Sequence, residues 1–268
     1  ALVRLGGAAL APLLAAETAC RERDEAVFLS TASQLASAGH DELARQHILD
    51  LCLASLRSAD PQARIEAANG LERLGWKAGA DADGAAFWIA RRQWDRASEL
   101  GDPAIDELLQ ALGRRGSEER VAAAIALGVA AANCTAPASQ TRLIQGLVSA
   151  LEDAEGELSG VLPASLGEVL RSLGDPADRF EVVGVLVALL DHWSHPVRVA
   201  AASALVGAFR HGNLDDTCRQ KILAERERMA RPHTDRLIVD DYCRREPGIG
   251  WYHVDIGTHV DEGIGVEL

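Results

Sequence analysis

Three His-x-Asp pairs near the C-terminal end are the residues whose types and spacing are best suited to chemistry. They are His233/Asp235, His253/Asp255 and His259/Asp261. In an extended segment, residues two positions apart point to the same side of the chain. A second His beside one such pair completes the two-His, one-carboxylate set of non-haem iron sites. His253, Asp255 and His259 therefore form a candidate metal site, which would make the chain a metal-dependent enzyme or accessory factor.

The same histidines have a second interpretation, in which the tail is an acidic arm whose His and Asp side chains hydrogen-bond locally. The segment 231–268 is rich in glycine and loses the helical period, although 251–256 alternates as a short strand would. His-rich tracts can also bind metals loosely. We favour the second interpretation, and we expect the chain to carry no cofactor.

The rest of the chain contains none of the common catalytic motifs that we sought. It has no G-x-S-x-G, no P-loop and no H-E-x-x-H. Its five cysteines are far apart and form no C-x-x-C pair, which argues against a zinc or disulfide framework. We therefore expect reduced thiols, a cytoplasmic location and a protein that is not a pocket-type enzyme.

Composition predicts which elements position these residues. The chain has 268 residues, of which 48% are hydrophobic but only 4% aromatic, so Ala and Leu carry most of the apolar content. This balance favours helices packed on helices, because a sheet would draw on Val, Ile and aromatic residues. The length fits five or six repeats of ~40 residues.

Charge and hydropathy argue against two classes of partner. The net charge of −13 argues against nucleic acid, whose phosphates are bound mainly by Lys and Arg. No apolar run reaches the ~18 residues of a membrane span. Gly6, Gly7 and Pro12 interrupt the apolar stretch 2–16, which we interpret as the end of one helix and the start of the next. Because the chain opens inside a repeat, we expect further sequence upstream.

Three segments share one helical pattern, in which an Arg is followed by Ala at i+4 and Leu at i+7. They are Arg64/Ala68/Leu71, Arg120/Ala124/Leu127 and Arg198/Ala202/Leu205. These offsets put the three residues on one helical face. Ala permits close contact with the next helix, Leu fills the core, and the Arg head can reach a carboxylate or a helix C-terminus. A degenerate repeat is predicted over 162–174.

The Arg120 and Arg198 segments, with the Leu-Gly-Asp-Pro-Ala-Ile turn at 100–105, resemble the HEAT-like repeats first described in phycobilin lyases. The resemblance covers roughly residues 1–230 and implies an all-α fold, an α-solenoid (superhelix) of antiparallel helix pairs. Such repeats occur in scaffolds, lyases and hydroxylases, so they specify fold better than function. The HEAT-like iron hydroxylases carry His-Glu pairs, and no repeat histidine here is followed by Glu.

We expect residues 1–230 to form the solenoid, interrupted by an exposed loop at 77–86 and an inserted helix at 87–100. The change in composition near 231 predicts that residues 231–268 form a non-helical or mixed tail, extended or docked on the solenoid.

The first function we expect is a protein–protein interaction scaffold or adaptor, because a solenoid offers a long groove to a partner. Trp and Arg dominate interface hot spots, so Trp88, Arg91, Arg92 and Trp193 are the candidate contacts. An acidic groove favours a basic protein or peptide. The alternatives are the metal-dependent role of the tail and a cofactor lyase or chaperone, which the resemblance alone supports.

Overall fold

The computed structural model describes residues 10–39, 41–210, 214–229, 238–240, 253–255 and 266–267. Up to residue 229 the described elements are helices, as the all-α prediction required. None of the described helices has both the length and the apolar character needed to cross a bilayer. The chain divides into two compact units, Ala1–Glu107 and Leu108–Leu268, which are called unit 1 and unit 2 below.

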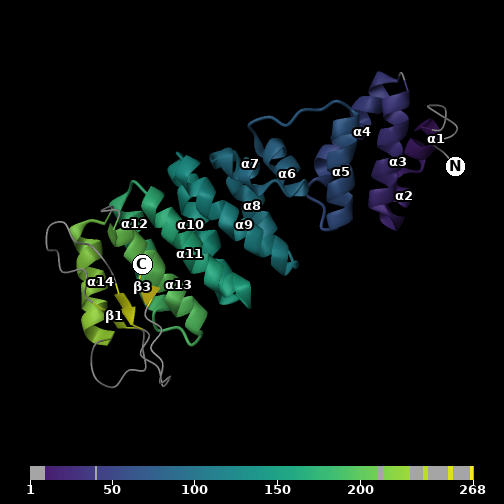
Figure 1. Ribbon diagram of the computed structural model, residues 1–268. Coiled ribbons are helices and arrows are strands. Elements are labelled where there is room, and N and C mark those ends of the chain that lie inside the picture. The colour runs from purple at the N-terminus through teal and green to yellow at the C-terminus, as the bar shows by residue number, and fades with distance from the viewer. Residues whose placement is uncertain are drawn as a thin grey trace. The chain divides into compact units, whose positions relative to one another are not determined.

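Unit 1 contains the helices that precede the boundary (Figure 1). They are α1 (Leu10–Ala15), α2 (Glu17–Arg23), α3 (Glu25–Ala38), α4 (Glu42–Ser55), α5 (Pro61–Arg73), α6 (Ala82–Ala90), α7 (Trp94–Glu99) and the 3-10 turn η2 (Asp102–Ala104). Helices α3 and α5 make the most extensive contact of this unit, and α4 packs on both. Leu29, Ile48 and Leu71 are completely buried between them.

Helix α8 (Ile105–Leu112) crosses the boundary between the units, and unit 2 continues from it (Figure 1). Its further helices are α9 (Ser117–Ala130), the 3-10 turn η3 (Ala131–Asn133), α10 (Pro137–Glu152), α11 (Glu157–Ser172), α12 (Pro176–Leu189), α13 (His195–Arg210) and α14 (Asp216–Met229). Helix α11 packs extensively on α9 and α13, which makes one layer. Helix α12 contacts α10 and α14, which makes a second. Successive helices therefore alternate between two layers in this unit, an arrangement consistent with a solenoid.

The repeated Ala and Leu positions form the contacts predicted for them. Ala68, Leu71, Ala124, Leu127, Ala202 and Leu205 are all at most 2% exposed. Each Arg of the pattern uses its guanidinium to hold carbonyl groups that precede its own helix: Arg64 Nη1 donates to Ser58 O at 2.9 Å, and Arg120 Nε donates to Leu112 O at 3.0 Å. Residues 162–172 of the predicted degenerate repeat at 162–174 lie in α11.

The inserted segment differs from the single helix predicted over 87–100. Helix α6 begins at Ala82, because the Asp81 side chain accepts a hydrogen bond from Gly84 N at 2.8 Å and caps the helix. The helix ends at Ala90, and Arg92 adopts a φ of 55°. Gln93 N then donates to Trp88 O at 2.8 Å, a C-cap geometry that glycine usually supplies. The predicted loop 77–86 is therefore half helix.

Beyond α14 the described residues form a small antiparallel sheet with strand order β1-β2-β3. Its strands are β1 (Ile238–Asp240), β2 (His253–Asp255) and β3 (Val266–Glu267). The register places His253 of the middle strand opposite Asp240 on one side and Glu267 on the other. Strand β1 also contacts α14. These strands are the described part of the tail, for which a non-helical or mixed structure is predicted, and the rest of 231–268 lies outside the described residues.

Candidate interaction surfaces

Trp88 is half-buried and packs against the core of unit 1. Its ring and that of Phe87 pack in a T-shaped arrangement, with the ring centroids 5.0 Å apart. The guanidinium carbon of Arg96 lies 4.6 Å from the centroid of the Trp88 ring, which is within cation–π range. The side chain therefore stabilises α6 and α7, and only part of it remains available to a partner.

Arg91 and Arg92 have different environments although they are adjacent. Arg91 Nη1 donates to Asn69 Oδ1 at 2.9 Å, and its Nε lies 3.5 Å from Glu72 Oε1, so the side chain is held against α5. Arg92 is exposed, and its backbone adopts the left-handed conformation just after the end of α6. Of the predicted contact residues, these two and Trp88 belong to unit 1.

Trp193 is the fourth predicted contact and lies in unit 2, in the turn between α12 and α13. Its side chain is 87% exposed. The ring lies on that of His192, with centroids 5.4 Å apart. Its carbonyl oxygen accepts a hydrogen bond from Arg198 Nη1 at 2.9 Å. The backbone of this turn is therefore fixed while the indole faces solvent, which suits a residue that anchors a partner.

Two exposed aliphatic residues on α9, Ile125 and Val129, were not predicted as contact residues from their place in the sequence. Ile125 is 52% exposed and Val129 is 48% exposed, and four positions separate them, so they lie on the same side of the helix. The Ala124 and Leu127 side chains on its other faces are completely buried. We call Ile125 and Val129 the α9 aliphatic pair. The sequence could have indicated this exposure, because neither residue belongs to the Arg120/Ala124/Leu127 pattern that marks the buried face of the helix.

Glycines bring the helices of the α9–α11–α13 layer close together. A Cβ atom at Gly128 would lie 3.2 Å from Ser165 Cα and 3.4 Å from Glu168 Cβ, and one at Gly167 would lie 2.6 Å from Ala204 Cβ. Between α11 and α13 this close approach leaves a shallow groove of about 200 Å³. It is lined mainly by small residues, with Glu168 and Arg171 at its edge. The groove and the α9 aliphatic pair thus lie on neighbouring helices of one layer.

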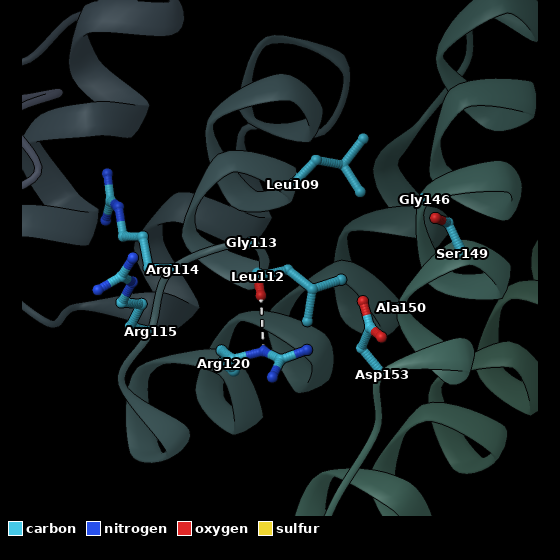
Figure 2. Close-up of a pocket in the computed structure, with 10 residues that line it drawn as sticks. All are labelled: Leu109, Leu112, Gly113, Arg114, Arg115, Arg120, Gly146, Ser149, Ala150 and Asp153. Atoms are coloured by element: carbon cyan, nitrogen blue, oxygen red, sulfur yellow. Dashed lines mark hydrogen bonds between the residues drawn. The ribbon is translucent and has the colours of Figure 1, made fainter.

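A larger pocket of about 430 Å³ lies where the end of α8 and the start of α9 face α10 (Figure 2). Leu109 and Leu112 form its apolar wall. Gly146 makes room for this wall, because a Cβ there would lie 2.2 Å from Leu109 Cδ2. Arg120 and Asp153 line the remaining sides, and Figure 2 shows the Asp153 carboxylate across from the Arg120 guanidinium.

Arg120 and Asp153 do not pair with each other. Arg120 Nε donates to Leu112 O at 3.0 Å, and neither residue forms an ion pair with any side chain in the described part of the chain. Arg114 also lines the pocket, but its Nη1 is 2.7 Å from Glu119 Oε1, so its charge is already balanced. In Figure 2 the side chains of Arg114 and Arg115 extend away from Asp153. Arg120 and Asp153 therefore hold opposite charges apart in the pocket, and Arg115 adds a further cation to its lining.

Comparisons with known proteins found no matching family model, no matching curated protein and no matching solved structure. Function must therefore be inferred from the chemistry of these surfaces.

The predicted metal ligands fall in the tail. His253 and Asp255 lie in β2, whereas His259 lies outside the described residues. The register pairs the backbone positions of Asp240 and Glu267 with that of His253, a pairing that the spacing along the chain did not suggest. Among the side chains that the structure does describe, no three His, Cys, Asp or Glu residues form a group that could hold a metal ion.

Two polar clusters in unit 1 are fully engaged in structural contacts. Glu25 accepts hydrogen bonds from Ser55 Oγ and Ser58 Oγ, both at 2.8 Å, and from Arg21 Nη2 at 2.9 Å. Burial raises the pKa of Glu25, but these hydrogen bonds outweigh it and hold the pKa below the ordinary value. A carboxylate so stabilised in its charged form is a weak general base.

The second cluster joins the segment after α4 to α6 and α8. Arg57 Nε donates to Glu107 Oε1 at 2.8 Å, and Arg57 Nη1 donates to Asp83 Oδ1 at 2.8 Å. Burial lowers the pKa of Arg57, but the hydrogen bonds to Glu107 and Asp83 outweigh it, so the pKa is raised. Glu107 is only 5% exposed. This network holds three segments of unit 1 together, and we assign it no chemistry.

Three of the described cysteines, Cys52, Cys134 and Cys218, are buried. Burial raises the pKa of the Cys52 thiol to about 12. Burial and the hydrogen-bonded Asp215 carboxylate raise the pKa of the Cys218 thiol to about 11. The thiolate is the nucleophilic form, so both thiols are unreactive at neutral pH. Neither is a candidate catalytic nucleophile.

Proposed function

We propose that the chain is a protein-interaction module of HEAT-like helix pairs that binds a protein partner on the α9–α11–α13 layer of unit 2. The observation that carries the proposal is the α9 aliphatic pair. Ile125 and Val129 expose about half of their side chains, one turn apart, on a helix where Leu127 is fully buried and Val121 is half-buried. Neighbouring exposed aliphatic residues of this kind suit the apolar centre of an interface.

The neighbouring features of unit 2 extend this surface. The groove between α11 and α13 presents small residues, so a partner can approach the helix backbones closely. A specific interface covers ~800 Å² on each partner, which is more than the aliphatic pair alone provides. The groove supplies further area on the same layer. The net charge of −13 favours a basic partner, because opposite charge accelerates encounter.

The double variant Ile125→Ser/Val129→Ser tests the proposal in affinity purification from native extract with quantitative mass spectrometry. We expect the wild-type chain to enrich at least one protein that the double variant fails to recover. Leu43→Ser is the matched control, because Leu43 is 85% exposed on α4 of unit 1 and lies outside the proposed surface. Equal recovery by the wild type and the double variant, or no enriched protein at all, would show that the proposal is wrong.

A metal-binding role for the tail is the second candidate, and the sheet register favours it. His253 faces Asp240 and Glu267, and facing positions of antiparallel strands lie on the same side of the sheet. One imidazole and two carboxylates are ligand types that Zn²⁺ and other divalent metals accept. Elemental analysis of untagged protein, purified without chelator, tests this role. Substoichiometric metal in the wild type, or equal metal content in His253→Ala, would contradict it.

A further inference from the structure

We propose that the pocket between α8, α9 and α10 binds the C-terminal residue of a partner protein. This inference rests on the proposed function in one respect, since the partner chain must supply that terminus. It concerns a different part of unit 2 from the α9 aliphatic pair. The pocket has three kinds of wall, and each one selects a different group of the ligand.

Arg120 supplies the cationic wall. Its Nε holds the Leu112 carbonyl oxygen at 3.0 Å, which fixes the guanidinium at the pocket. By contrast, Arg64 and Arg198 each reach two carbonyl oxygens with Nη1. The contacts described for Arg120 leave its Nη groups to a ligand, and Figure 2 shows one of them directed toward the side of the pocket that Asp153 occupies. Two parallel N–H groups match the two oxygens of a carboxylate.

Asp153 supplies the anionic wall and narrows the choice of ligand. A bare anion next to Arg120 would also lie near this carboxylate and be repelled by it. A ligand that fits must therefore place a hydrogen-bond donor beside its carboxylate. Leu109 and Leu112 add an apolar surface to the pocket, and Figure 2 shows the Leu112 side chain next to the two charges and that of Leu109 farther from them.

A C-terminal residue carries all three groups on one α-carbon: a carboxylate, a backbone N–H and a side chain. An Asp or Glu side chain carries its carboxylate one or two carbons away from the backbone and offers no apolar side chain of its own. Capture of a terminal carboxylate is a known mode of peptide recognition. The volume of about 430 Å³ lies within the range of small-ligand sites. An aliphatic C-terminal residue such as leucine fits this set of walls.

Two probes that differ at one end test the site: N-acetylglycyl-leucine with a free carboxylate, and its carboxamide. They are titrated into the uniformly ¹⁵N-labelled full chain, and backbone amide shifts are followed by NMR. We expect saturable shifts at 109–120 and 146–153 with the acid, and binding about tenfold weaker with the amide, which corresponds to loss of one charge-assisted interaction. N-acetylglutamic acid α-amide, which offers a side-chain carboxylate, is expected to bind as weakly as the amide.

Ser149→Glu is the informative variant, because Ser149 is exposed at the pocket and its replacement leaves the Arg120–Leu112 hydrogen bond intact. The added carboxylate should abolish binding of the acid. Ser203→Glu places the same charge in the α11–α13 groove and should leave binding unchanged. Equal binding of acid and amide, shifts confined to other helices, or no saturable shift at millimolar probe would overturn the proposal. Because this assay uses purified protein and a defined probe, its failure is distinguishable from failure of the affinity purification.

Discussion

Arg198 Nη1 donates a hydrogen bond to the carbonyl oxygen of His192 at 2.9 Å, which ties the start of α13 to the turn that follows α12. Arg179 forms the corresponding bond in α12, where its Nε donates to Leu173 O at 2.8 Å. With Arg64 and Arg120, four helices use an Arg in their first turn to hold the carbonyl groups just before them. Helix ends leave such carbonyls without intrahelical partners, so these arginines fix the hairpin turns.

Arg198→Ala should lower the free energy of unfolding by about 1–2 kcal/mol, because two carbonyl groups lose a charged donor. This loss lies in the lower part of the range for hydrogen bonds to charged groups. The reason is that Arg198 Nε is buried without a partner among the described residues, and the substitution also removes this unpaired group. Urea denaturation measures the change. Arg115→Ala is the control, because Arg115 is exposed and should cost less than ~0.5 kcal/mol. Equal losses of stability in the two variants would mean that the turn between α12 and α13 does not depend on Arg198.

Two glycines of α11 should respond to alanine in opposite directions. At Gly167 the new Cβ would lie 2.6 Å from Ala204 Cβ, so α11 and α13 must separate, at a cost of about 1–3 kcal/mol. At Gly160 the nearest atom is Pro196 Cβ at 4.0 Å, which is ordinary contact. Gly160→Ala should therefore stabilise the helix by about 0.5–1 kcal/mol. The thermal unfolding midpoints of the two variants, compared with that of the wild type, test this difference. A higher midpoint for Gly167→Ala would contradict the close packing of α11 on α13.

The two carboxylates that bind Arg57 should differ sharply in importance. The Glu107 side chain is 6% exposed and that of Asp83 is 43% exposed. Removing Glu107 leaves a partly buried guanidinium without its principal partner, so Glu107→Ala should cost about 3–5 kcal/mol. Asp83→Ala removes a solvent-screened contact and should cost about 1 kcal/mol or less. Chemical denaturation measures the free energy of unfolding of both variants. A larger loss of stability for Asp83→Ala than for Glu107→Ala would contradict the assignment of Glu107 as the principal partner of Arg57.

Cys52 should make the folded chain less stable in alkali. Burial raises the pKa of its thiol to about 12 from an ordinary value of 9.0, so the folded state keeps a proton that the unfolded state loses. The stabilisation is complete below pH 9.0 and is lost as pH rises toward 12. The free energy of unfolding should fall by up to about 1.4 kcal/mol per pH unit in this window from this group. The free energy of unfolding, measured by denaturation from pH 8 upward, should fall less steeply with pH for Cys52→Ala than for the wild type. Equal pH dependence of the two proteins would show that the Cys52 thiol does not contribute.

The helix pattern was predictable because it depends on local spacing. Arg64, Arg120 and Arg198, each with Ala at i+4 and Leu at i+7, correctly predicted buried helical faces. Arg179 was missed because Val183 rather than Ala follows it at i+4, although Leu186 lies at i+7, and its function shows only in the bond to Leu173 O. The break between α6 and α7 was also missed, since Arg92 occupies a left-handed position that sequence usually marks with glycine.

The surfaces were harder to predict, because exposure depends on which neighbours a helix acquires. Trp88 and Trp193 looked alike as candidate contacts, yet one packs on the core of unit 1 and the other is 87% exposed. The pocket depends on Arg120 and Asp153, which are 33 positions apart and approach only through the packing of α8 and α9 on α10. The tail shows the same limit, because the spacing along the chain could not indicate that the sheet register pairs His253 with Asp240 and Glu267, while the predicted His259 lies outside the described residues.

Photo-crosslinking in cells tests the central claim most directly. A benzoylphenylalanine residue placed at position 125 projects from the α9 aliphatic pair, and the same residue at position 43 projects from an exposed site on α4 of unit 1. We predict a discrete crosslinked product with another protein from position 125 and none of matching size from position 43. Absence of any product at position 125, with the chain expressed and folded, would contradict a partner-binding surface on α9.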